Sequence, residues 1–225
     1  MSDASGRRPK ETWGTFPTRR LEALSDGVFA IAMTVIALEL TALVGEVQDM
    51  RTMLREALAP LSAYVLSFLI LSLFWLAHHL SLAYTERTDR LHVALMLLFL
   101  MLMAIIPFPA ALIGTHPQAP EAFVIYAAVL TAAALILDVA WVYADRSASN
   151  SASTSGNADW AGRALRLRLR VAIAGYVACV CIAYLFPGWG IPAFFVAHVV
   201  LLFRPAHAPP SHEDEEQAAA EGAAR

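Results

Sequence analysis

The first long apolar stretch of the chain, residues 20–40, reads RLEALSDGVFAIAMTVIALEL. A helix needs about 20 mainly apolar residues to cross the hydrocarbon core of a bilayer, and this stretch has that length. It also holds Glu22 and Asp26 near its start and Glu39 near its end. Ionisable side chains are costly inside a membrane, so their presence in a span indicates a functional segment. We therefore predict a transmembrane helix that does more than anchor the chain.

The composition of the whole chain favours a membrane protein over a soluble one. Of its 225 residues, 58% are hydrophobic and only 16% are charged, and the mean hydropathy is +0.57. A soluble domain of this length would need more charge to cover its surface. We predict an all-α membrane protein with six transmembrane helices per chain, without internal repeat, over residues 20–204. The predicted spans are 24–44, 58–84, 91–113 (interrupted by Pro107 and Pro109), 120–143, 169–186 and the short 190–203.

Three segments lie outside the predicted spans. Residues 1–19 form a basic N-terminal segment, residues 145–160 predict a flexible loop rich in Ser, Ala, Asn and Gly, and residues 205–225 predict a disordered acidic tail. Arginines flank the spans mainly on one side: before the first span, after the second and before the fifth. The positive-inside rule makes that side cytoplasmic. We expect a multi-pass protein of the cell (inner or plasma) membrane with both termini and the 145–160 loop in the cytoplasm.

Within the first span, Ile31, Thr34 and Leu38 are spaced three and four residues apart. Residues at this spacing lie on one face of a helix. Small residues elsewhere in the span allow neighbouring helices to approach closely. Taken alone, a stripe of Ile, Thr and Leu is typical of ordinary helix packing.

A second group of polar residues lies in the predicted second span. Trp75 is one helical turn from both His78 and His79, so it shares a face with each. Polar groups need partners in lipid, and this group lies at the same depth as the start of the first span. We predict a structural network in which Trp75 and one histidine hydrogen-bond Ser25 or Asp26. The predicted network residues are Arg20, Ser25, Asp26, Trp75, His78 and His79.

The remaining polar residues of the spans favour ordinary packing. No Cys or paired acid lies near the two histidines in sequence, so a zinc site is not favoured and we expect no metal. Cys179 and Cys181 are interpreted as small buried apolar residues. Asp138 and His198 are interpreted as single polar contacts within the bundle.

The start of the first span resembles the transmembrane protein 175 family, the potassium channels of lysosomes and their prokaryotic relatives. The family pattern is Arg, three residues, then Phe-Ser-Asp; here Arg20, Ser25 and Asp26 match it, and Leu24 stands in place of Phe. The GVFAIAMT run and Leu-Glu-Leu at 38–40 also resemble the prokaryotic, six-span branch. The FWLAHH run at 74–79 extends the likeness into the second span.

The resemblance implies a homotetramer with the first helices lining a central pore. It places Ile31 at the narrowest ring, Thr34 at a hydroxyl ring and Leu38 at a second apolar ring. Apolar constrictions gate by dewetting, because a dry narrow ring blocks ions until it widens. We therefore expect a potassium-permeable cation channel with passive conduction across a lipid bilayer. We expect monovalent cations as its cargo, and no enzyme activity, cofactor or nucleic-acid partner.

Two alternative functions remain open. One is a proton-coupled secondary transporter that uses Asp26 with His78 and His79 as a relay. Transporters tend to show paired repeats with broken helices at the midplane, whereas only the third span has such a break here. The other is a membrane enzyme with a histidine-based site, although no nucleophile or metal triad accompanies the histidines.

Overall fold

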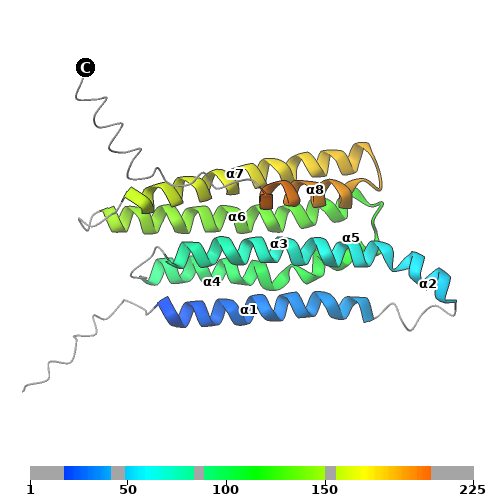
Figure 1. Cartoon of the computed structure of the whole chain (residues 1–225), viewed down its shortest axis with the longest axis horizontal. Coiled ribbons are helices and arrows are strands. Elements are labelled where there is room, and N and C mark those ends of the chain that lie inside the picture. The colour runs from blue at the N-terminus through cyan, green and yellow to red at the C-terminus, as the bar shows by residue number, and fades with distance from the viewer. Residues whose placement is uncertain (1–17, 42–48, 84–88, 150–155, 204–225) are drawn as a thin grey trace, which may run out of the picture.

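The computed structural model describes residues 18–41, 49–83, 89–149 and 156–203, and every regular element in these ranges is helical (Figure 1). Side chains are described in these ranges except at 39, 83, 145–149, 156–165 and 202–203. The helices are α1 Thr18–Glu39, α2 Met50–Glu56, α3 Leu58–Ala83, α4 Arg90–Ile105, α5 Pro107–Thr115, α6 Pro120–Ser149, α7 Gly156–Leu185 and α8 Gly190–Phe203. The predicted all-α class is therefore confirmed.

Five segments in the described part of the chain are long and apolar enough to cross a bilayer. They are Thr18–Leu38, Leu58–Leu82, Arg90–Thr115, Pro120–Ala144 and Arg166–Leu185. The sixth predicted span coincides with α8, an apolar helix of 14 residues that is shorter than a full span. Its Phe194 and His198 side chains are buried in the bundle. The count of six crossings stays a prediction.

The break predicted in the third span is present. α4 ends at Ile105 and α5 begins at Pro107. Proline has no backbone N–H, so it cannot continue the hydrogen-bond ladder from within a helix, but it is tolerated at a first turn. Ile106 keeps a helical backbone conformation between the two helices. α4 and α5 therefore run along the bundle as one segment with a local interruption between them.

Helices extend beyond several predicted boundaries. α6 continues to Ser149 and α7 begins at Gly156, so helix occupies both ends of the segment 145–160 that we predicted as a loop. α1 begins at Thr18, which lies inside the predicted N-terminal segment 1–19. Hydropathy predicts only the part of a helix that lies in lipid. It therefore misses the polar turns that continue the same helix outside the lipid. The predicted tail 205–225 lies outside the described residues.

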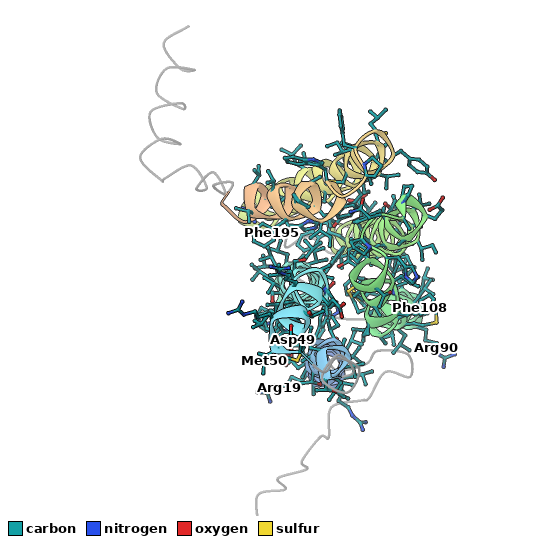
Figure 2. The ribbon with its side chains drawn as sticks, turned by 90° about the vertical axis from the view of Figure 1, so that its right-hand side faces the viewer. Arg19, Asp49, Met50, Arg90, Phe108 and Phe195 are labelled. Atoms are coloured by element: carbon teal, nitrogen blue, oxygen red, sulfur yellow. The ribbon has the colours of Figure 1, made fainter. Side chains whose placement is uncertain are left out.

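The helices run side by side along the long axis of the molecule (Figure 1). α1 packs on α3 and α4 at one side, and α7 packs on α6 and α8 at the other. Figure 2, viewed along the bundle, shows Arg19 of α1 and Phe195 of α8 on opposite sides. The Phe123 ring of α6 packs directly on the start of α8, since a Cβ atom at Gly190 would lie 2.4 Å from that ring. Only glycine fits this contact.

Candidate functional site

The helix α1 has two distinct faces. Leu21, Ser25, Phe29, Ala32 and Ile36 are buried against the rest of the bundle. Their spacing of three and four residues places them along one side of the helix. The opposite side carries Ile31, Thr34 and Leu38, all of them exposed. The predicted stripe therefore does not take part in packing within its own bundle.

The exposed stripe is apolar with hydroxyl groups between the aliphatic side chains. Ile31 is 64% exposed and Leu38 is 63% exposed. Thr34 Oγ1 donates a hydrogen bond of 2.8 Å to the carbonyl oxygen of Ile31. This bond uses the hydroxyl proton, so the lone pairs of the oxygen stay available to a cation. Thr41, which was not among the predicted residues, extends the stripe and donates to the carbonyl oxygen of Leu38 at 2.7 Å.

Polar contacts join the start of α1 to α3. Trp75 Nε1 donates to Asp26 Oδ1 at 2.9 Å, and Ser25 Oγ lies 3.4 Å from His78 Nε2. The His79 ring stacks on Trp75, with ring centroids 5.5 Å apart. The structure thus brings together Ser25, Asp26, Trp75, His78 and His79; we call these five residues the α1–α3 polar cluster.

Arg20 lies apart from the α1–α3 polar cluster. Its side chain is exposed in the first turns of α1, whereas Ser25 is buried against α3. Arg20 and Asp26 are six positions apart, and that spacing does not place two side chains one above the other on a helix. The inclusion of Arg20 in the predicted network is therefore not supported by a contact in the described part of the chain.

The geometry at Ser25 assigns the proton on His78. The Ser25 hydroxyl donates to the carbonyl oxygen of Leu21 at 2.7 Å. A hydroxyl has one proton, so its oxygen can only accept from His78, and Nε2 of His78 carries the hydrogen. The His78 ring is buried and stacks on Phe99, with centroids 5.3 Å apart and planes 6° from parallel. The contact with Ser25 of α1 and the stacking on Phe99 of α4 therefore fix this ring between the two helices.

A further polar contact, between α6 and the start of α4, was not predicted. Asp89 caps α4 by accepting from the backbone N–H of His92 at 2.9 Å, and Tyr143 donates its hydroxyl proton to the same carboxylate. Burial acts to raise the pKa of Asp89, but the hydrogen bonds from Tyr143 and from the His92 backbone outweigh it and lower the pKa. The only sequence signal was an acidic residue two positions before the predicted span 91–113, and Asp is typical of an N-cap.

The other polar residues of the spans have varied surroundings. His198 is buried, with Nδ1 2.7 Å from the carbonyl oxygen of Phe194. Asp138 Oδ1 is buried and makes no hydrogen bond to the described residues. Cys179 is buried as expected, but Cys181 is exposed. Within the described residues, no group of three or more His, Cys, Asp or Glu side chains is placed to hold a metal ion.

Comparison with known proteins identifies similar sequences and a similar structure. Residues 20–107 match the model of the family described as endosomal/lysosomal potassium channel TMEM175. A potassium channel of Streptomyces collinus is 32% identical over 81% of this chain and 88% of its own length. A potassium channel of Chamaesiphon minutus is 34% identical over 56% of this chain and 66% of its own length.

A solved structure has the same fold. The crystal structure of a lysosomal potassium-selective channel TMEM175 homolog from Chamaesiphon minutus superposes with a TM-score of 0.67 at 27% identity. The match covers 85% of this chain and 98% of the solved chain. The matched family region contains the exposed stripe and the α1–α3 polar cluster described above.

Proposed function

This chain belongs to the TMEM175 family of potassium channels, and from that premise we propose that it is a potassium-permeable cation channel whose pore is lined by α1. The observation that carries the proposal is the exposure of the stripe formed by Ile31, Thr34 and Leu38. Large aliphatic side chains on the outside of a bundle contact either lipid or another protein chain. A hydroxyl flanked by them is suited to a narrow aqueous passage.

The exposed position of the stripe favours a pore between chains. Homo-oligomers of channels are cyclic, so one stripe repeats around a shared axis. In a homotetramer, four copies of α1 would give an Ile31 ring, a Thr34 ring and a Leu38 ring. The aliphatic rings would gate by dewetting, and the Thr34 hydroxyls would replace part of the hydration shell of a cation. Such a pore has few strong ligands, so its preference for potassium over sodium is modest.

The α1–α3 polar cluster supports this orientation of α1. Asp26 and Ser25 contact α3 residues, which fixes the rotation of α1 about its own axis. With that rotation fixed, Ile31 and Leu38 point away from their own bundle. We propose a positioning role for the cluster, while the stripe contacts the ions. Both termini would lie in the cytoplasm, on the side where arginines flank the spans.

The decisive experiment uses purified protein in liposomes with an imposed potassium gradient. We expect passive potassium flux whose size and direction follow the membrane voltage. This flux should not require a gradient of a second ion. Empty liposomes and liposomes with heat-denatured protein are the controls. Potassium flux that occurs only with opposite proton movement would contradict the channel and favour a transporter that uses Asp26, His78 and His79. Absence of any cation flux from correctly folded oligomers would also contradict the proposal.

A further inference from the structure

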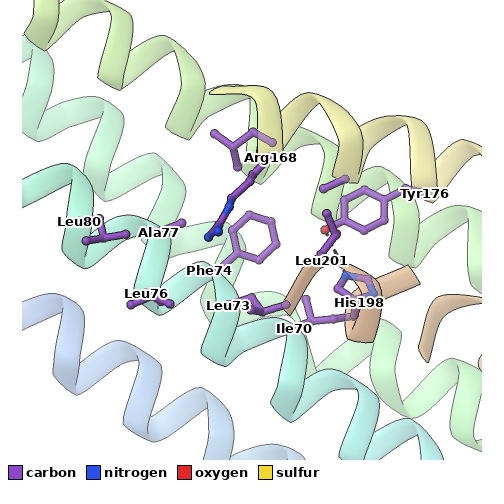
Figure 3. Close-up of a pocket in the computed structure, with 12 residues that line it drawn as sticks. Ile70, Leu73, Phe74, Leu76, Ala77, Leu80, Arg168, Tyr176, His198 and Leu201 are labelled. Carbon is purple, nitrogen blue, oxygen red and sulfur yellow. Dashed lines mark hydrogen bonds between the residues drawn. The ribbon is translucent and has the colours of Figure 1, made fainter. Parts of the chain in front are cut away.

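A cavity of about 80 Å³ lies between α3, α7 and α8, and α3 separates it from α1 (Figure 3). A volume of this size holds several groups as large as a water molecule or a methylene. Its walls are mostly aliphatic and include Ile70, Leu73, Leu76, Leu80, Leu169 and Leu201. Leu76 and Leu80 are 40% and 37% exposed, so the cavity is open on the α3 side.

Three polar side chains line the cavity, and one of them carries a permanent charge. Tyr176 and His198 are buried and stack on each other with ring centroids 5.4 Å apart. The Tyr176 hydroxyl lies 3.4 Å from His198 Nε2, so this pair is held within the protein. Arg168 leaves α7 and points toward α3, where Phe74 and Ala77 lie (Figure 3). It therefore places a guanidinium at a cavity whose other walls are mostly aliphatic.

The position and chemistry of Arg168 select the kind of ligand. It lies two residues inside the segment Arg166–Leu185, at the level where a span meets the headgroups. A guanidinium has five N–H donors, so it can bind an anionic oxygen and keep a contact within the protein. Phosphate matches its donor geometry, and hydrocarbon matches the aliphatic walls. A ligand with both features is an anionic amphiphile.

We propose that this cavity binds one anionic phospholipid, with its phosphate on Arg168 and one acyl chain along Ile70, Leu73 and Leu201. The proposal does not depend on ion conduction, because the cavity is lined by α3, α7 and α8, whereas the exposed stripe belongs to α1. A neighbouring copy of the chain is a less suitable occupant of this opening. To pair with the guanidinium, it would have to bury a carboxylate against aliphatic side chains, which is costly.

The test is native mass spectrometry of the purified full-length protein in detergent, titrated with dioctanoyl phosphatidylglycerol. Dioctanoyl phosphatidylcholine is the parallel titration. We expect one phosphatidylglycerol bound per chain at concentrations where phosphatidylcholine does not bind. Arg168→Gln should weaken this binding about tenfold, because a charged hydrogen bond is lost. Arg170→Gln is the matched control, since Arg170 is exposed on the same helix and does not line the cavity.

A second pair of variants tests the acyl-chain part of the site. Ala172→Leu fills the cavity, whereas Ala174→Leu adds the same side chain at an exposed position of α7. We expect only Ala172→Leu to lower lipid occupancy, in spectra that show an unchanged oligomer. Equal losses in Arg168→Gln and Arg170→Gln would overturn the proposal in favour of general attraction to basic residues. Wild-type lipid binding by Ala172→Leu would overturn the proposal as well. So would an Ala172→Leu protein whose oligomer changes while its lipid occupancy does not.

Discussion

The two faces of α1 differ in their contacts although both are largely apolar. Phe29 is 1% exposed and packs against Phe99 and His78, whereas Ile31, two residues later, is 64% exposed. Hydropathy therefore does not distinguish the face that stabilises the bundle from the face available to a partner or a pore. Both faces combine branched aliphatic side chains with hydroxyl groups, and the packed face differs chiefly by the aromatic ring of Phe29.

The largest expected effect is on stability, from a change on the packed face. Phe29→Ala removes a fully buried ring, and such changes cost about 3–5 kcal/mol of unfolding free energy. Ile31→Ala is the matched change on the exposed face and should cost less than about 0.5 kcal/mol. Denaturant unfolding in detergent micelles, followed by circular dichroism, measures both. Similar losses for the two variants would contradict the separation of α1 into two faces.

The next largest effect is expected at the α1–α3 polar cluster, which fixes the rotation of α1 about its own axis. Asp26→Ala leaves the N–H of the partly exposed Trp75 without its acceptor, and an unsatisfied polar group costs about 1–3 kcal/mol when it is fully buried. Because Asp26 is itself exposed, we expect the lower part of this range. The loss should appear as reduced oligomer in size-exclusion chromatography with unchanged ion preference in the molecules that assemble. Asp26→Asn keeps a carbonyl acceptor and should restore assembly. A fully assembled Asp26→Ala with altered selectivity would move Asp26 into the ion path.

Most of the fold follows from periodicity and length along the sequence. The second span was predicted at 58–84 and α3 spans Leu58–Ala83, and the interruption at Pro107 has a local chemical cause. The ends of α6 and α7 were predicted less well, since 145–149 and 156–160 are helical. Ser, Asn and Gly are typical of loops, but propensity is a weak signal when neighbouring turns already propagate a helix.

The candidate site could be predicted only in part, because a local pattern does not show which helices pack together. Helical spacing placed Ile31, Thr34 and Leu38 on one stripe, but spacing alone does not show which side of a helix the bundle covers. That information depends on where α3 and α4 pack. The Asp89–Tyr143 contact joins residues 54 positions apart in sequence, and no local pattern pairs them.

A smaller effect, now on conduction, is expected from the exposed face. Ile31→Asn places an amide in the proposed constriction, so water enters more readily and potassium flux should rise severalfold. Stability should change little, because the site is exposed. Val177→Asn, at a 59% exposed position on α7, is the control for a polar group on the outside of the bundle. Equal flux from wild-type and Ile31→Asn liposomes would remove Ile31 from the gate.

The smallest effect concerns ion preference and depends on one oxygen atom. Thr34 donates its proton to the Ile31 carbonyl, so its hydroxyl oxygen is oriented as an acceptor toward the exposed side. Thr34→Ala removes that acceptor and should change the potassium-to-sodium permeability ratio about twofold, which corresponds to about 0.4 kcal/mol. The reversal potential under bi-ionic conditions measures this ratio. Thr34→Ser keeps the oxygen and should retain the wild-type value. If Thr34→Ala has the wild-type reversal potential, the hydroxyl ring makes no contribution to selectivity, and the exposed face of α1 acts through its aliphatic side chains alone.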